Sequence, residues 1–259
     1  MDPGPPFRAD HVGSLLRPPP LIEAREQFLA GTLGPEALQV VEDTCIREAI
    51  AMQERVGLQS VTDGEFRRSS WRNGFFLNVD GFAEEWEEAT FDFKLEGGKT
   101  QKTAPVPRVV GKLKRRSGIA TDEFAFLKAN TGRTPKVTLP APSVMHFFRG
   151  DASVDRAVYS DVREYMADVS AIYREEIADL AALGCTYVQF DDVALPILCD
   201  PEIQTLVRAR GEDADALVDL YIDALNDALR DRPEGVAVCV HMCRGNVGAG
   251  IASGGYEPI

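Results

Sequence analysis

The sequence lacks the features that would place the protein in a membrane, outside the cell or on nucleic acid. No apolar run approaches the roughly 20 residues that a bilayer-spanning helix needs. The first residues have no basic region followed by an apolar core, so they do not form a secretory signal. Basic residues number 28 against 41 acidic ones, and a net charge of −13 disfavours nucleic acids and anionic membranes as partners. We therefore expect a cytoplasmic protein that binds neither.

Cysteine is also scarce, and the five residues present are odd in number and irregularly spaced. This pattern predicts free thiols in a reducing compartment, not a disulfide framework. Repeats, low-complexity tracts and linkers are absent as well. A chain of 259 residues with 44% hydrophobic and 27% charged residues has the size and composition of one large α/β domain. We expect residues 1–259 to form a single domain.

Helical and β-like patterns alternate along most of the chain. Apolar residues recur at helical spacing over 20–30, 35–56, 158–183 and 203–229. Short strand-like runs occupy 12–15, 60–65, 136–140, 186–191 and 236–243. Such alternation predicts a parallel sheet, and polar residues at the ends of the strands favour a TIM-type (β/α)8 barrel over an open sheet.

Residues 80–117 interrupt this alternation. Residues 91–95 alternate with a period of two, Gly97-Gly98 is a turn signal, and residues 108–113 are again strand-like. We predict a β-hairpin insertion near 90–113 that leads into a barrel strand. With that strand the chain holds about six β/α units of the eight in a full barrel. We expect a barrel incomplete at its C-terminal side, whose edge strands are covered by self-association or by a second polypeptide.

One strand ends in a pair of potential metal ligands, His241 and Cys243. Side chains two residues apart on a strand point the same way, with Cα atoms about 6.6 Å apart. Imidazole and thiolate are both zinc ligands, so the pair predicts half of a zinc site. Cys239 shares this face but lies about 13 Å from Cys243, too deep to share the metal. A hydrogen-bonded core histidine and a buried cysteine are the alternative.

Carboxylates follow two other strands. Asp63 and Glu65 flank Gly64, so both could face one pocket; a solvated acidic loop is the alternative. In the strand 186–191, alternation turns Asp191 inward and makes Asp192 an outward or capping residue. An N-cap role for this acidic pair is the alternative interpretation.

Two weaker signals accompany these carboxylates. The segment 11–14 offers backbone N–H groups and a hydroxyl where the first strand ends. Arg67, Arg68 and Arg72 follow the acidic loop, and guanidinium groups bind anionic groups well. For most of these arginines we expect a solvated face, with one or two of them contributing to a site.

Together the motifs resemble the cobalamin-independent methionine synthase family, specifically its catalytic C-terminal barrel and its single-barrel homologues. Each motif is short, but their order and spacing cover nearly the whole chain. The residues that carry the resemblance are Val12-Gly13-Ser14, Asp63-Gly64-Glu65, Leu139-Pro140-Ala141-Pro142, Gln189-Phe190-Asp191-Asp192-Val193-Ala194-Leu195 and His241-Met242-Cys243.

This resemblance implies roles for individual residues. His241 and Cys243 match the first two zinc ligands of the family, whose further glutamate and cysteine ligands would lie beyond Ile259. Glu65 and Asp191 match the carboxylates that hold the amino group of homocysteine, and we take them as the catalytic residues. The backbone positions that meet the substrate carboxylate are matched by Val12 and Ser14.

The implied reaction is zinc-dependent transfer of a methyl group to a thiol, most simply homocysteine, which gives methionine. The family implies a methyltetrahydrofolate as donor. Phe147-Phe148 stands near the position of a tryptophan that stacks on the pterin, which leaves the donor open. A second reading is the opening of an epoxide by a thiol such as coenzyme M, although two ammonium-binding carboxylates favour an amino-acid thiol. A third is a catalytically silent, incomplete barrel.

Overall fold

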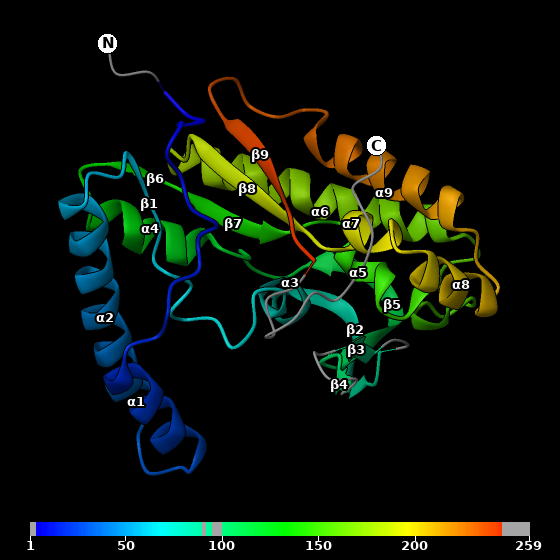
Figure 1. The fold of residues 1–259 in the computed structure, drawn as a ribbon, viewed down its shortest axis with the longest axis horizontal. Helices are drawn as coiled ribbons and strands as arrows, with labels where there is room; N and C mark the ends of the chain where they lie inside the picture. Colours follow the sequence, from blue (N-terminus) through cyan, green and yellow to red (C-terminus); the bar gives the residue numbers. More distant parts are fainter. Residues whose placement is uncertain (1–3, 90–91, 95–99, 245–259) are drawn as a thin grey trace.

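A computed structural model describes residues 4–89, 92–94 and 100–244 of the chain (Figure 1). Its helices are α1 (Pro19–Leu29), α2 (Pro35–Arg55), α3 (Asn73–Asn78), α4 (Thr121–Ala129), α5 (Val144–Phe147), α6 (Val162–Ala182), α7 (Ala194–Leu198), α8 (Pro201–Ala209) and α9 (Ala214–Leu229). The strands are β1 (Ser60–Val61), β2 (Val79–Glu87), β3 (Asp92–Lys94), β4 (Thr100–Lys102), β5 (Val106–Arg115), β6 (Thr134–Pro135), β7 (Val137–Pro140), β8 (Tyr187–Asp192) and β9 (Ala237–Met242). Within these ranges, no helix is both long and apolar enough to cross a bilayer.

The parallel strands follow one another in chain order. β7, β8 and β9 form a parallel three-stranded sheet, and β1 pairs in parallel with β6. The two sheets are joined where the backbone N–H of Lys136 donates to the carbonyl of Val61 over 2.8 Å. Ser14 extends the series through a parallel bridge to Gly64. The predicted parallel α/β arrangement is therefore confirmed. Ser14 and the strands β1, β6, β7, β8 and β9 form an arc, which the described residues do not close into a barrel.

The predicted hairpin is present, because the consecutive strands β3 and β4 pair antiparallel, but the strand that follows it does not run where we expected. Residues 108–113 do form part of a strand, β5, but β5 pairs antiparallel with β2 and does not join the parallel arc. The prediction that this segment enters the barrel was wrong. In β5 the buried Val109 and Leu113 alternate with exposed Arg108 and Lys112, whereas every residue of β7 is buried. One buried face suits an antiparallel ribbon, and strands of a parallel barrel are buried on both faces.

The predicted helix over 203–229 is in fact two helices. α8 ends before Gly211, whose φ of +89° is a left-handed backbone conformation that favours glycine. α9 then begins after Asp213, whose side chain accepts a hydrogen bond from the N–H of Ala216 over 2.9 Å. Gly211 after the end of α8 and the Asp213 N-cap of α9 separate two helices that the apolar pattern had predicted as one.

The two faces of the β7–β9 sheet differ in polarity. Val188 and Phe190 of β8 lie in the main apolar core with α6 and α9, and the ring of Phe190 is 5.4 Å from that of Tyr173 on α6. The opposite face presents polar groups, among them Thr138 and Gln189. Since that polar face lies inside the arc, it forms the natural wall of a site.

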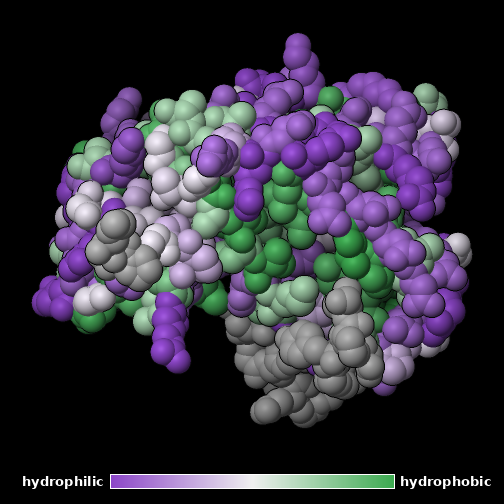
Figure 2. All heavy atoms as spheres, turned by 90° about the horizontal axis from the view of Figure 1, so that it is seen from above, coloured by the Kyte–Doolittle hydropathy of each residue, from purple (hydrophilic) through white to green (hydrophobic). Residues whose placement is uncertain are grey.

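The outer face of β9 is only partly covered. Val240 and Met242 remain 39% and 40% exposed. Figure 2 shows apolar side chains gathered in the middle of one face of the molecule, with hydrophilic side chains around them. In the described part of the chain, the edge of β9 away from β8 has no strand partner. That a second copy or another polypeptide covers this edge stays a prediction.

One buried carboxylate ties the insertion to the rest of the fold. Glu176 of α6 has no exposed surface, and its Oε2 accepts from Nη2 of Arg115 at 2.6 Å and from the N–H of Ile119 at 2.9 Å. Its Oε1 accepts from the N–H of Ala120 at 2.7 Å, at the start of α4. Glu176 thus joins three elements that approach each other only in the folded chain.

We expect Glu176→Gln to lower the free energy of unfolding by about 3 kcal/mol or more, because it leaves the guanidinium of Arg115 without its buried partner. The control is Asp223→Asn, which removes an ion pair between Arg163 and Asp223 whose side chains are 62% and 70% exposed. Its cost should be below about 1 kcal/mol. Denaturant unfolding of both variants measures the difference, and equal midpoints would contradict the role given to Glu176.

Candidate functional site

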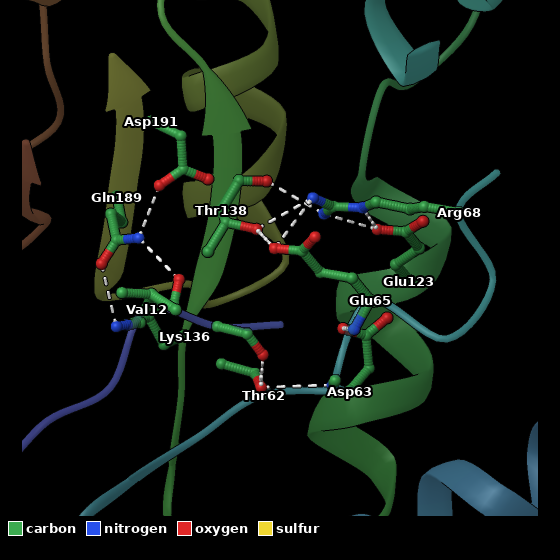
Figure 3. Close-up of polar contacts among 12 residues, drawn as sticks. Val12, Thr62, Asp63, Glu65, Arg68, Glu123, Lys136, Thr138, Gln189 and Asp191 are labelled. Atoms are coloured by element: carbon green, nitrogen blue, oxygen red, sulfur yellow. Dashed lines mark hydrogen bonds and ion pairs between the residues drawn. The ribbon is translucent and has the colours of Figure 1, made fainter. Parts of the chain in front are cut away.

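Polar side chains from several strands meet inside the arc (Figure 3). The strand register pairs Thr138 with Gln189 on neighbouring strands, and Asp191 with His241 on the next pair. In parallel strands, paired positions share one face of the sheet. Glu65, which follows β1, reaches the same place, because its Oε1 accepts a hydrogen bond from Oγ1 of Thr138 over 2.8 Å.

Glu65 is held in an unusual backbone conformation. Its φ is +59°, and among the non-glycine residues that the structure describes it alone has a positive φ. The turn is fixed from both sides: Oδ1 of Asp63 accepts from the N–H of Glu65 over 2.9 Å, and Arg17 donates to the carbonyl of Glu65 over 3.2 Å. A strained, buried carboxylate at the end of a strand is a mark of a functional position.

Arg68 lies beside Glu65 with its side chain only 9% exposed, as expected for one or two of these arginines. Its Nε and Nη2 donate to Oε2 of Glu123 over 2.9 and 2.7 Å, and its Nη1 lies 3.7 Å from Oε1 of Glu65. Burial disfavours the charge, but Glu123, Glu65 and Asp63 outweigh it and hold the pKa of Arg68 above its ordinary value. Burial also raises the pKa of Asp63 to about 6, against the opposing effect of Arg68.

Arg72 is buried too, in a different setting. Its Nη2 donates to the carbonyl of Pro105 over 3.0 Å, and its guanidinium lies 4.7 Å from the centre of the Phe148 ring. Burial lowers the pKa of Arg72 to about 10. Of the three arginines considered from the sequence, Arg68 therefore belongs to the polar cluster and Arg72 to the packing beneath Phe148.

Asp191 faces the same interior as Glu65. Its Oδ1 accepts from Nε2 of Gln189 over 2.7 Å, and the side chain is turned toward the Thr138 side in Figure 3. Burial raises the pKa of Asp191 to about 7; the nearby carboxylate of Glu65 adds to this, while the Gln189 hydrogen bond opposes it. Asp192 points the other way and caps α7, accepting from the N–H of Leu195 over 3.0 Å, as predicted.

The N-terminal segment closes one side of this cluster. The carbonyl of Val12 accepts from Nε2 of Gln189 over 2.7 Å, and Oγ1 of Thr62 donates to the carbonyl of Gly13 over 2.6 Å. Ser14 pairs with Gly64, the residue before Glu65. The structure thus places Val12 and Ser14 next to the strand ends that carry the two carboxylates, while their binding role stays a prediction.

The two potential zinc ligands lie at the end of β9. His241 is half-buried beside Asp191; burial and Lys136 lower its pKa, and Glu65 opposes them. Cys243 follows the strand, and its N–H donates to the carbonyl of Asp192 over 3.0 Å. Cys239 lies deeper, where its Sγ is 3.7 Å from the hydroxyl of Tyr187.

A second cluster of potential metal ligands lies outside the arc and was not predicted from the sequence. It combines His146, Asp151 and Glu212, whose ligand atoms all lie within 4.8 Å of one another. These atoms are already engaged. Nδ1 of His146 is 2.9 Å from the hydroxyl of Tyr221, and Glu212 pairs with Arg210 at 2.7 Å. Asp151 is likewise paired with a nearby arginine. Two guanidiniums beside the carboxylates disfavour a cation, so this cluster is structural.

Comparison with known proteins places the chain in a family. Residues 8–250 match the family model described as the catalytic domain of cobalamin-independent synthase. The uncharacterized protein YxjH of Bacillus subtilis (strain 168) is 36% identical over 256 residues, which are 98% of this chain and 66% of that protein. The 5-methyltetrahydropteroyltriglutamate–homocysteine methyltransferase of Corynebacterium efficiens is 26% identical over 92% of this chain and 29% of its own length.

A solved structure agrees with this placement. The putative vitamin-B12 independent methionine synthase from Listeria monocytogenes matches with a TM-score of 0.75 and 29% identity, over 93% of this chain and 66% of that one. The chain thus spans about two thirds of the length of YxjH and of the Listeria protein. The extent of the family match, together with the order of the strands and their polar ends, shows that the chain belongs to the cobalamin-independent methionine synthase family, in its catalytic domain.

Proposed function

We propose that the protein transfers a methyl group to the thiol of an amino acid, most simply homocysteine, with zinc bound at the end of β9. The observation that carries the proposal is the pair of carboxylates that face one interior: Glu65, which is buried in the turn after β1, and Asp191, which is partly buried near the end of β8. Glu65 is close enough to raise the pKa of Asp191, and it also opposes the lowering of the His241 pKa.

The charges around this pair leave room for one more cation. Arg68 donates twice to Glu123 and is only 3.7 Å from Glu65, so one guanidinium is shared between two carboxylates. Lys136, a buried cation nearby, pairs with Asp10 at 3.1 Å. Arg17 also lies near Glu65, and its guanidinium donates to the backbone carbonyls of Glu65 and Arg68. Asp191 is left with a neutral amide as its hydrogen-bond partner. A substrate ammonium would supply the missing positive charge and two or three hydrogen-bond donors.

His241 and Cys243 would hold the zinc ion. Imidazole and thiolate are the donor types that zinc prefers, and two further ligands are implied by the family downstream of the described residues. When bound, zinc would stabilise the substrate sulfur as a reactive thiolate at neutral pH. Glu65 and Asp191 would orient the amino group so that the thiol points toward the end of β9. Asp191 lies on a strand and Glu65 in a hydrogen-bonded turn, and these fixed positions would reduce the entropy lost in alignment.

The methyl donor is inferred from the relatives. A methyltetrahydrofolate is favoured by the names of relatives such as the Corynebacterium enzyme. Phe147 and Phe148, which stand near the family's pterin-stacking position, are 0% and 4% exposed. Opening of an epoxide by a sulfonate thiol is disfavoured, because a sulfonate would meet Glu65 and Asp191 with the same sign of charge. A catalytically silent chain would bind homocysteine without forming methionine, so an assay of methionine formation separates that outcome.

We expect Glu65→Gln and Asp191→Asn each to weaken homocysteine binding tenfold or more, because each removes a charge-assisted hydrogen bond to the ammonium. Calorimetric titration of the zinc-loaded chain measures this. 4-Mercaptobutanoate, which is homocysteine without its amino group, is the matched control ligand and should bind the variants as well as the wild type. Equal losses for both ligands, or a large fall in melting temperature, would make the carboxylates structural.

Homocysteine binding should also depend on pH through Asp191. Its pKa of about 7 means that the neutral acid dominates below neutrality, and only the ionised form attracts an ammonium. We expect the dissociation constant for homocysteine to fall as pH rises from 6 to 8, and this dependence to flatten in Asp191→Asn. A wild-type profile that the variant reproduces would assign the titration to another group.

Zinc content provides a test that needs no substrate. After dialysis against a weak chelator, His241→Ala and Cys243→Ala should retain several-fold less zinc than the wild type, because each removes one ligand. Cys199→Ala is the control, since Cys199 is a free thiol whose Sγ lies 3.5 Å from the carbonyl of Leu195, away from the proposed site. Equal zinc in all four proteins would exclude these ligands.

A further inference from the structure

A second set of polar residues lies deeper inside the arc, beneath the two carboxylates. At its centre is Lys136, whose side chain has no exposed surface. Its ammonium donates to Oδ2 of Asp10 over 3.1 Å, to the carbonyl of His11 and to Oε1 of Gln189 over 3.0 Å. These three acceptors match the three hydrogens of an ammonium, so the buried charge is fully satisfied.

Gln189 is oriented by this arrangement. An ammonium has no acceptor capacity, so only the oxygen of the Gln189 amide can face Lys136. The amide nitrogen must then point away, and its two hydrogens go to the carbonyl of Val12 and to Oδ1 of Asp191, each 2.7 Å from Nε2. Figure 3 shows these contacts running in series from Lys136 through Gln189 to Asp191.

One amide nitrogen therefore joins the two halves of the proposed substrate site. Val12 belongs to the segment expected to meet a carboxylate, and Asp191 is one of the two groups expected to hold an ammonium. Because both are hydrogen-bonded to the same atom, their separation is fixed. An α-amino acid carries its ammonium and carboxylate on a single carbon, so it needs two recognition groups held side by side.

We propose that Gln189, oriented by Lys136, is a positioning residue that selects α-amino-acid thiols by locking the Val12–Ser14 segment and Asp191 at a fixed spacing. This inference rests on the proposed function and adds the residues that enforce its specificity. Lys136 and Gln189 do not contact the substrate. They act through Asp10, Val12 and Asp191, whose positions would otherwise be set independently.

The first test uses the chain without substrate. In Gln189→Glu, Oε1 can still accept from Lys136, but both hydrogen bonds donated by Nε2 are lost. We expect backbone amides in residues 10–17 to exchange hydrogen at least tenfold faster in this variant, and in Gln189→Met, than in the wild type. Cys239→Ala is the matched control, because Cys239 lies 3.8 Å from Oε1 of Gln189 but bonds neither Val12 nor Asp191. It should leave that exchange unchanged.

The second test measures selectivity by calorimetry. The ligands are homocysteine, 4-mercaptobutanoate, which lacks the amino group, and 3-mercaptopropylamine, which lacks the carboxylate. In the wild type and in Cys239→Ala, homocysteine should bind much more tightly than either analogue, because both of its groups are met at once. In the two Gln189 variants this advantage should shrink by about tenfold, while the analogues lose little.

The outcomes separate the inference from the function on which it rests. Wild-type protein that binds homocysteine no better than its analogues would overturn the proposed function, and the selectivity assigned to Gln189 with it. Homocysteine selectivity in the wild type that both Gln189 variants retain, with unchanged exchange in residues 10–17, would overturn only the positioning role. Gln189→Glu keeps the volume and the Lys136 contact, so a failure of Gln189→Met to fold would not prevent the test.

Discussion

The need to neutralise charge inside the arc governs the arrangement around the site. Arg68 and Lys136 are both buried, and an unpaired buried cation would cost several kcal/mol. Each is therefore surrounded by oxygen atoms from segments far apart in the chain: Arg68 by Thr138 and Glu123, and Lys136 by Asp10 and Gln189. Arg68 thereby anchors the loop after β1, and Lys136 anchors the N-terminal segment through Asp10 and His11. The two carboxylates assigned to the substrate, Glu65 and Asp191, lie beside these charges, and Asp191 has only a neutral amide as its hydrogen-bond partner.

This incomplete neutralisation of charge explains why carboxylates with raised pKa values cluster inside the arc. Asp63 and Asp191 both have raised pKa values, mainly because burial disfavours their charged forms. A fold selected for stability alone would replace them with neutral residues, since burying carboxylates without full compensation is unfavourable. Three unfavourable features therefore lie together: the burial of Asp63, the burial of Asp191 and the strained backbone of Glu65. Such a concentration is typical of a binding or catalytic site.

The sequence predicted the parallel strands and most of the long helices, because apolar periodicity reports burial directly. It also predicted the inward direction of Asp191 and the capping role of Asp192, which follow from strand alternation. It failed for residues 108–113, where one-sided burial distinguishes a ribbon from a barrel strand, and for the break between α8 and α9. Arg68 could not be singled out among the candidate arginines, and Lys136 was not predicted at all, because their partners lie 55 and 126 residues away and a local pattern does not indicate a long-range ion pair.

The separation of 126 positions between Asp10 and Lys136 also bears on the order in which the structure is assembled during synthesis. Within the arc, each pairing joins a strand to an arc strand made earlier in the chain, although β2–β5 are made between β1 and β6, so the sheet can grow as the chain emerges from the ribosome. The N-terminal segment is made first, and it can reach Ser60 and Gly64 early. Its remaining anchors, Lys136, Tyr187 and Gln189, appear much later. The oldest part of the nascent chain is thus among the last to reach its final position, and the substrate site matures only after β8 has formed.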